Sequence, residues 1–230
     1  MPHIRGPALR PRFCAAYGHA AQKLGAAMEI RTVGIVGAGQ MGTGIAHVCA
    51  LAGYDVTLTD VNAAVLDRAL AQIGHNLDRQ VARGKVSEGD KAAALARITP
   101  TLKLADLGPL DLIIEAATER EEIKQRIFAD LAPHLGSRTI LTSNTSSISI
   151  TRLASRTDRP ERFMGFHFMN PVPVMQLVEL IRGIATDAET FDACLAVVNR
   201  LGKTASTSED FPAFIVNRIL MPMINEAVYT

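Results

Sequence analysis

The 230-residue sequence has no marked charge excess and no long apolar run. Its formal net charge of +1 excludes the global basic excess that draws proteins to nucleic acid or anionic membranes, although a local basic patch can still bind phosphates. No apolar run approaches the roughly 20 residues that a membrane span needs. We therefore expect neither a nucleic-acid nor a membrane partner.

Cysteine is also scarce. The chain has three, Cys14, Cys49 and Cys194, which lie far apart and form neither a CxxC pair nor a metal-binding spacing. The sequence thus predicts no metal site, buried reduced thiols at Cys49 and Cys194, and a cytoplasmic location.

Residues 1–28 contain no acidic residue and no serine, and they carry four basic residues: Arg5, Arg10, Arg12 and Lys23. An Arg-rich segment without acids is typical of an organelle transit peptide, but such peptides are also Ser-rich. The missing serines favour the alternative, an upstream start with Met28 as the real beginning. Both interpretations predict a disordered N-terminal extension over residues 1–28.

Short apolar runs alternate with helical segments from residue 32 onward, which predicts an α/β fold of Rossmann type with a mostly parallel sheet. Most of the runs are apolar on successive residues, as strands covered on both faces should be. We expect strands at 32–36, 56–58, 110–114, 139–141, 163–168 and 177–181. We expect helices at 41–52, 63–83, 121–135 and 191–201, and a helical hairpin whose turn at 85–91 leads into a helix at 92–96.

A strongly apolar helix is predicted from Phe211 onward, and the sequence stops within it at Thr230. A helix this apolar should be buried, yet nothing follows to bury it. We therefore expect a truncated chain or a partner subunit that covers the helix. The predicted domains are a Rossmann-type domain over 29–209 and the start of an all-α domain over 210–230.

The motif at 37–42, GAGQMG, follows the first strand, opens a helix, and precedes Asp60 at the end of the second strand. Gly37 permits the tight turn, Gly39 lets the backbone approach a pyrophosphate, and Gly42 allows close packing of helix on strand. Asp60 would accept hydrogen bonds from ribose hydroxyls and repel a 2′-phosphate, so the sequence predicts NAD rather than NADP. Gln40 and Met41 lie within the same motif and are further cofactor candidates.

His167 ends a strand, where open α/β sheets place their ligands. Its imidazole suits a general base near neutral pH. Glu179 lies in the next apolar strand, where an unpaired carboxylate would be costly to bury. A contact between the two would fix the tautomer of the imidazole and raise its basicity. The alternatives are a hydrogen-bonded core histidine and a surface carboxylate.

Hydroxyl and amide side chains follow another strand, in the sequence SNTSS at 143–147. Such a cluster can orient a nicotinamide and polarise a substrate oxygen, or it can simply cap a helix. Asn144 and Ser146 are the candidates there. Asn217, in the apolar C-terminal helix, needs a partner for its amide, and a substrate carbonyl is one.

These segments together resemble the L-3-hydroxyacyl-CoA dehydrogenase family, and within it the compact bacterial 3-hydroxybutyryl-CoA dehydrogenases. The resemblance covers residues 31–230 and rests on SNTSS at 143–147, HFMNPVPVMQLVE at 167–179 and FIVNR at 214–218. It implies that Ser146 binds the substrate oxygen and His167 is the base. It also implies that Glu179 orients His167 and that Asn217 holds the thioester or its 3-oxygen.

The resemblance further implies that Glu119, Lys124 and Asn170 contact the cofactor. The hairpin would contact coenzyme A, with phosphate partners at Arg79, Arg83 and Lys85. Family members continue with helices that complete the substrate domain and form a homodimer. This chain departs from the family at Ala213, where glycine is usual, and we expect a tighter turn there.

The leading hypothesis is NAD-dependent oxidation of a short (S)-3-hydroxyacyl-CoA to the 3-oxoacyl-CoA. A second hypothesis is a related sugar-acid dehydrogenase of the L-gulonate type, which uses the same base on a substrate without coenzyme A. A third is a catalytically inert NAD-binding module. The 170–175 segment, NPVPVM, and the basic hairpin favour a coenzyme A substrate.

Overall fold

The computed structural model describes residues 28–230. The predicted extension therefore lies outside the described residues except for Met28, which packs into the core at 7% exposure.

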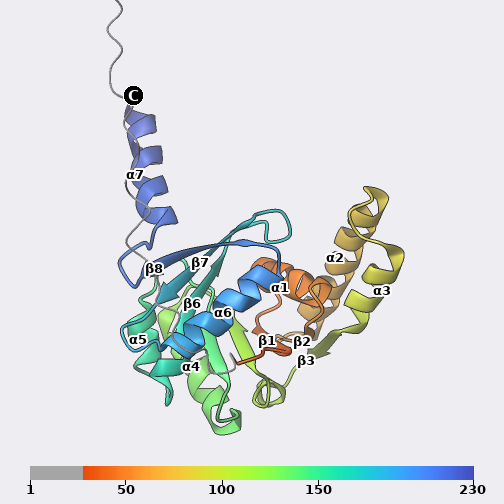
Figure 1. The fold of residues 1–230 in the computed structure, drawn as a ribbon, viewed down its shortest axis with the longest axis horizontal. Coiled ribbons are helices and arrows are strands. Elements are labelled where there is room, and N and C mark those ends of the chain that lie inside the picture. Colours follow the sequence, from red (N-terminus) through yellow and green to blue (C-terminus); the bar gives the residue numbers. More distant parts are fainter. Residues whose placement is uncertain (1–27) are drawn as a thin grey trace, which may run out of the picture.

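An eight-stranded sheet forms the middle of the molecule (Figure 1). Its strand order is β3-β2-β1-β4-β5-β6-β7-β8. Every neighbouring pair is parallel except β6 and β7, which are antiparallel. This confirms the predicted mostly parallel Rossmann-type fold. The strands are β1 (Thr32–Val36), β2 (Asp55–Thr59), β3 (Ile98–Thr101), β4 (Leu112–Glu115), β5 (Ile140–Ser143), β6 (Phe163–Phe168), β7 (Leu177–Arg182) and β8 (Thr204–Glu209).

Helices cover both faces of the sheet. Ile45 of α1 and Val197 of α6 share one buried apolar cluster, whereas Phe128 of α4 and Leu153 of α5 belong to a second cluster. Strands between two such layers are apolar on successive residues, as β4 is. The helices are α1 (Gln40–Leu51), α2 (Ala63–Ala82), α3 (Glu88–Ala96), α4 (Glu121–Leu131), α5 (Ile150–Ala154), α6 (Ala188–Arg200) and α7 (Val216–Tyr229). Short 3₁₀ turns lie at Leu104–Leu107, Ala132–His134 and Pro160–Arg162.

Helices α2 and α3 form the predicted hairpin, which extends from one side of the molecule (Figure 1). The turn is shorter than expected, because Ser87 caps α3 by accepting a hydrogen bond from the nitrogen of Asp90. Helix α3 therefore begins at Glu88 and not at residue 92.

Both cysteines within the described part of the chain are free and buried, as predicted for Cys49 and Cys194. Burial raises the pKa of the Cys49 thiol to about 12, and burial also raises the pKa of Cys194. Among residues 28–230, no helix is long and apolar enough to cross a membrane.

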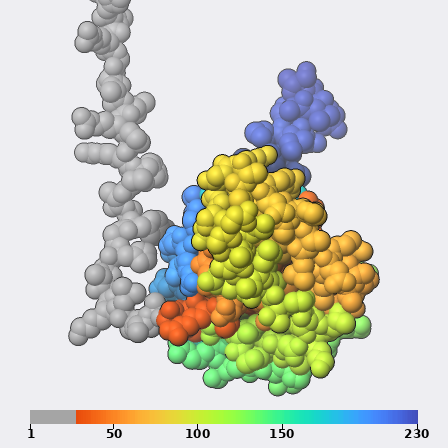
Figure 2. Space-filling model, turned by 90° about the vertical axis from the view of Figure 1, so that its right-hand side faces the viewer, coloured from red at the N-terminus to blue at the C-terminus, as the bar shows by residue number. Residues whose placement is uncertain are grey.

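The last helix, α7, begins later than predicted. We expected it from Phe211, but Ala213 and Phe214 adopt left-handed backbone conformations, with φ of 67° and 51°, and the helix starts at Val216. It projects away from the rest of the molecule (Figures 1 and 2). None of its residues is buried, and Ile219, Met223 and Val228 are 63%, 58% and 76% exposed.

Candidate active site

The glycine motif forms a tight turn between β1 and α1. Gly37 has φ of 98°, and a Cβ on Gly42 would lie 1.7 Å from the carbonyl oxygen of Gly37. A Cβ on Gly39 would meet nothing within 4 Å, so the space beside this residue is open. The first N–H groups of a helix have no partner within the helix. The turn therefore has room and donors for a pyrophosphate at the start of α1.

Two cavities flank the glycine turn and fit the two ends of a dinucleotide. One, of about 540 Å³, is lined by Asp60 and by apolar side chains such as Leu102 and Ile127, which suits an adenosine. The other, of about 520 Å³, is lined by Gly39, by His167 and by polar residues that follow β4 and β5. They share Ala117 and Thr118. The residues present thus fit the NAD that the sequence predicts.

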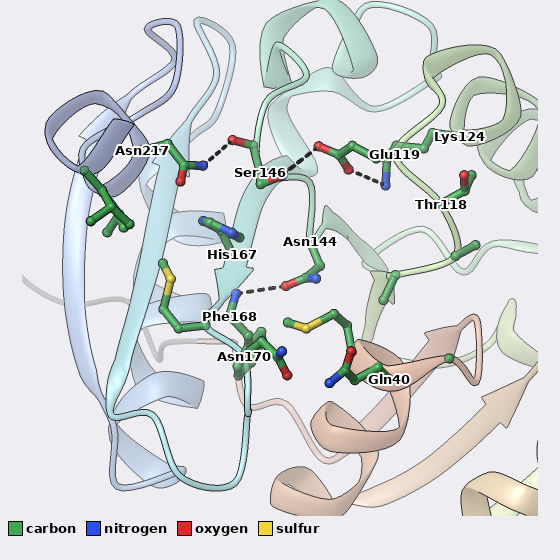
Figure 3. Close-up of a pocket in the computed structure, with 17 residues that line it drawn as sticks. Gln40, Thr118, Glu119, Lys124, Asn144, Ser146, His167, Phe168, Asn170 and Asn217 are labelled. Atoms are coloured by element: carbon green, nitrogen blue, oxygen red, sulfur yellow. Dashed lines mark hydrogen bonds and ion pairs between the residues drawn. The ribbon is translucent and has the colours of Figure 1, made fainter. Parts of the chain in front are cut away.

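His167 and Glu179 meet as predicted. They are direct partners in the antiparallel pair of β6 and β7, and Nδ1 of His167 lies 2.8 Å from Oε2 of Glu179. Because an ionised carboxylate only accepts hydrogen bonds, Nδ1 carries the proton and Nε2 is the free base. The imidazole lines the polar cavity of about 520 Å³, near Ser146 and Asn144 (Figure 3).

Glu179 is fully buried, at 0% exposure. Burial by itself raises the pKa of this carboxyl group, but hydrogen bonds from His167 and from the backbone nitrogens of Val216 and Ile215 outweigh it and lower the pKa below its usual value. The group therefore stays ionised near neutral pH and can accept the hydrogen bond from Nδ1 of His167.

The serine loop at 143–147 is bound to Glu119. One oxygen of this carboxylate accepts hydrogen bonds from Thr145, at 2.6 Å from Oγ1, and from the backbone nitrogens of Ser146 and Ser147, at 2.9 and 3.0 Å. It also lies 3.2 Å from Oγ of Ser146. Burial raises the pKa of Glu119, but these hydrogen bonds outweigh it and lower the pKa. Glu119 thus positions the loop and also lines the cavity (Figure 3).

Lys124 is buried at 1% exposure, although its residue type is usually exposed. Its Nζ donates to Oε2 of Glu115 at 2.5 Å and lies 3.9 Å from Glu119. Glu115 is the last residue of β4 and also accepts a hydrogen bond from Oγ of Ser143. Sequence analysis missed Glu115, although a carboxylate at the end of an apolar strand is a recognisable signal.

The remaining predicted residues surround the same cavity (Figure 3). Asn144 accepts a hydrogen bond from the backbone nitrogen of Phe168 at 2.8 Å, and the side-chain nitrogen of Asn217 donates to the carbonyl oxygen of Ser146 at 3.1 Å. Gln40, Met41 and Asn170 line the cavity as well. The structure therefore brings the predicted catalytic residues and these cofactor candidates together.

The predicted basic residues of the hairpin line none of these cavities. A further cavity, of about 560 Å³, lies between α2 and the loop after β6, and it shares Gly39, Gln40 and Asn170 with the polar cavity. Arg68 lines it, whereas Arg79, Arg83 and Lys85 are exposed and do not. Sequence analysis missed Arg68, because an exposed helical arginine carries no local signal.

Comparisons with known proteins show the family of the chain. Residues 32–211 match the family model described as 3-hydroxyacyl-CoA dehydrogenase, NAD binding domain. A 3-hydroxybutyryl-CoA dehydrogenase of Bradyrhizobium diazoefficiens is 61% identical over 204 residues, which cover 89% of this chain and 70% of the relative. The chain belongs to the 3-hydroxyacyl-CoA dehydrogenase family. It is therefore an NAD-dependent oxidoreductase.

Further relatives agree. A 3-hydroxybutyryl-CoA dehydrogenase of Clostridioides difficile is 43% identical over 194 residues, covering 84% of this chain and 69% of the relative. The crystal structure of an (S)-3-hydroxybutyryl-CoA dehydrogenase from Ralstonia eutropha matches with a TM-score of 0.84 and 50% identity, over 86% of this chain and 70% of that one. These family members have the Rossmann-like fold described above.

Proposed function

We propose that the chain oxidises a short (S)-3-hydroxyacyl-CoA, such as 3-hydroxybutyryl-CoA, to the 3-oxoacyl-CoA. The observation that carries the proposal is the contact of 2.8 Å between His167 and Glu179 beside a cavity that begins at the glycine turn. The short acyl chain is supported by the names of the similar proteins from Bradyrhizobium and Ralstonia.

In this proposal, Nε2 of His167 removes the proton of the 3-hydroxyl group. NAD, when bound, supplies the hydride acceptor. Glu179 keeps the other ring nitrogen protonated and stabilises the imidazolium that forms. Ser146 and Asn217 line the same cavity and bind the substrate oxygen and the thioester. Glu119, Lys124, Asn144 and Asn170 serve the cofactor side.

Coenzyme A is assigned to the cavity between α2 and the loop after β6. This cavity joins the polar one at Gly39, Gln40 and Asn170, so a substrate with its reacting carbon near His167 extends naturally into it. Arg68 gives it a cation for a phosphate. A sugar acid of the L-gulonate type would leave this cavity unused.

The chain organisation follows from the same assignment. We infer that residues 29–209 form the NAD-binding domain and that 210–230 begin a helical substrate domain. The exposed apolar side chains of α7 support a homodimer in which this helix is covered, since large apolar patches mark interaction surfaces. The free, buried cysteines support a cytoplasmic location.

The test is the substitution His167→Gln in the full-length protein. With acetoacetyl-CoA and NADH, we expect turnover to fall by roughly 10²–10⁴-fold, the usual contribution of a general base. His75→Gln, at an exposed histidine of α2, is the matched control and should keep wild-type turnover. Near-normal turnover of His167→Gln would remove the base from the mechanism.

Two further outcomes separate the alternatives. Faster turnover of L-gulonate than of 3-hydroxybutyryl-CoA would favour the sugar-acid hypothesis. Binding of NADH with no turnover of either substrate would favour an inert NAD-binding module.

A further inference from the structure

The first turn of α7 contacts the catalytic pair from behind. The backbone nitrogens of Ile215 and Val216 both donate to Oε1 of Glu179, at 3.0 and 2.9 Å. The other oxygen, Oε2, is the one that contacts His167. Oε1 of this buried carboxylate therefore binds the start of α7, and Oε2 binds the imidazole of His167.

Glu179 needs these two donors. It is fully buried, and a neutral His167 offers it only one hydrogen bond before the proton arrives. The N–H groups at the start of a helix are otherwise unpaired and lie at the positive end of the helix dipole. They stabilise the ionised carboxylate and, because they bind one oxygen, they also restrict rotation of the group. Rotation would move Oε2 off Nδ1.

An unusual backbone turn orients the two N–H groups towards Glu179. Ala213 and Phe214 are both left-handed, at φ of 67° and 51°, which is unfavourable for residues that carry a Cβ. Phe214 compensates by packing its side chain, 4% exposed, into the apolar cluster of α4 and α5. A strained conformation persists only where its surroundings enforce it. The side chain of Phe214 is therefore the local packing that holds the turn.

We propose that the left-handed turn at Ala213 and Phe214 is a positioning element for the catalytic pair. It places the N–H groups of Ile215 and Val216 against Glu179 and so keeps the carboxylate aligned with His167. Asn217 follows directly in the same helical turn and donates to the loop of Ser146. The position of the start of α7 is thus coupled both to the orientation of His167 and to the position of the serine loop. This inference rests on the proposed function.

The experiment that tests this proposal measures the protonation of His167 directly. The ring nitrogens of His167 are followed by ¹⁵N NMR across a pH titration in the full-length protein, which needs no turnover. Glu119 and Lys124 are the other charged side chains lining the cavity of His167, and the variants leave them unchanged. Glu179→Gln defines the signals and pKa of an imidazole without its carboxylate.

Ala213→Val places a β-branched residue in a conformation that such residues strongly disfavour. We expect the ring-nitrogen shifts and pKa of His167 to move at least half of the way towards those of Glu179→Gln. Phe214→Leu, which reduces the packing of the turn without a new backbone restriction, should move them in the same direction. Ala213→Gly, which suits a left-handed residue, is the matched control and should keep wild-type values.

The proposal is overturned if both Ala213→Val and Phe214→Leu keep wild-type signals while Glu179→Gln changes them. It is also overturned if Ala213→Gly changes them as much as Ala213→Val does. Loss of the proposed function gives a different pattern: His167→Gln would retain turnover, whatever the ring nitrogens of the wild-type protein report.

Discussion

Asp60 accepts a hydrogen bond from the backbone nitrogen of Ala38, at 2.9 Å from Oδ2. The carboxylate that we expected to contact the ribose of the cofactor therefore also joins the end of β2 to the glycine turn. A second bond, from the nitrogen of Asn62 to Oδ1, orients it further. The side chain proposed to select the cofactor thus also holds the shape of the glycine turn.

Asp60→Asn separates these two roles, because an amide oxygen can still accept from Ala38 but carries no charge. We expect NADH to bind about 10-fold more weakly, since hydrogen bonds to charged groups contribute about 1.5–3 kcal/mol. Discrimination against NADPH should shrink as the repulsion of its 2′-phosphate is lost. Fluorescence titration with both cofactors measures this. Asp55→Asn, at an exposed position of β2, is the control; unchanged NADPH discrimination would contradict the assignment.

Arg68→Ala tests where coenzyme A binds. We expect KM for acetoacetyl-CoA to rise about 3–10-fold, because a partly screened phosphate contact is lost, while KM for NADH stays constant. Arg79→Ala changes the same residue type on the same helix, outside the cavity. A larger rise in Arg79→Ala than in Arg68→Ala would instead support the end of the hairpin as the phosphate site.

Because Lys124 and Glu115 form a buried pair, substitutions of the two residues should have strongly coupled effects on the free energy of unfolding. Lys124→Met should lower the free energy of unfolding by about 3–5 kcal/mol, because it leaves a buried carboxylate unpaired. The double variant Lys124→Met, Glu115→Gln should recover most of that loss, as replaced ion pairs often do. Urea unfolding of both single variants and the double variant measures the coupling. Additive losses would show that the two side chains do not depend on each other.

The hydrogen bonds of Asp210 predict that part of the folding stability is lost in acid. It accepts hydrogen bonds from Oγ of Ser149 and from the backbone nitrogens of Ile150 and Thr151 at the start of α5, at 2.6, 3.0 and 2.8 Å. Burial raises its pKa, but these hydrogen bonds outweigh it and lower the pKa below 3.8. A lowered folded-state pKa contributes stability that is present above the unfolded value and is lost as pH falls through the folded value.

Asp210→Asn should therefore lower stability by about 1–2 kcal/mol at neutral pH, in the range of a lost helix cap. The difference in Tm from wild type should begin to narrow as pH falls below about 4, where the carboxyl group of the unfolded chain takes up a proton. It should be smallest once pH has fallen through the lowered folded-state pKa. Thermal unfolding from pH 7 to 3 measures it, with Asp192→Asn on the exposed side of α6 as control. A constant difference across this range would contradict the linkage.

Much of the site was predictable because its signals are local. The glycine turn with Asp60 follows from backbone requirements within about 25 residues, a range typical of one βαβ unit. His167 and Glu179 lie on strands joined by a short loop, so their pairing follows from the register of one antiparallel pair. The structure confirms that geometry, and the catalytic roles remain predictions.

Strands β3 and β8 and helix α5 were not predicted, because their sequences lack a local apolar pattern long enough to indicate an element. Strand β3 contains a proline, β8 is largely polar, and α5 has only five residues. Strands β3 and β8 exist because each pairs with one neighbour at an edge of the sheet, and edge strands need no continuous apolar pattern. The expected start of α7 at Phe211 was wrong because apolar periodicity does not report a left-handed turn.

By itself, the sequence determined the fold class, the cofactor and the family, because turn chemistry, apolar patterning and motif spacing act over a few residues. Only the tertiary structure decided that Glu119 binds the serine loop, that Lys124 pairs with Glu115, and that the start of α7 donates to Glu179. Those contacts join residues that are close only after folding. Burial of a charged group is allowed where partners from other elements complete its hydrogen bonds, and no local pattern encodes those partners.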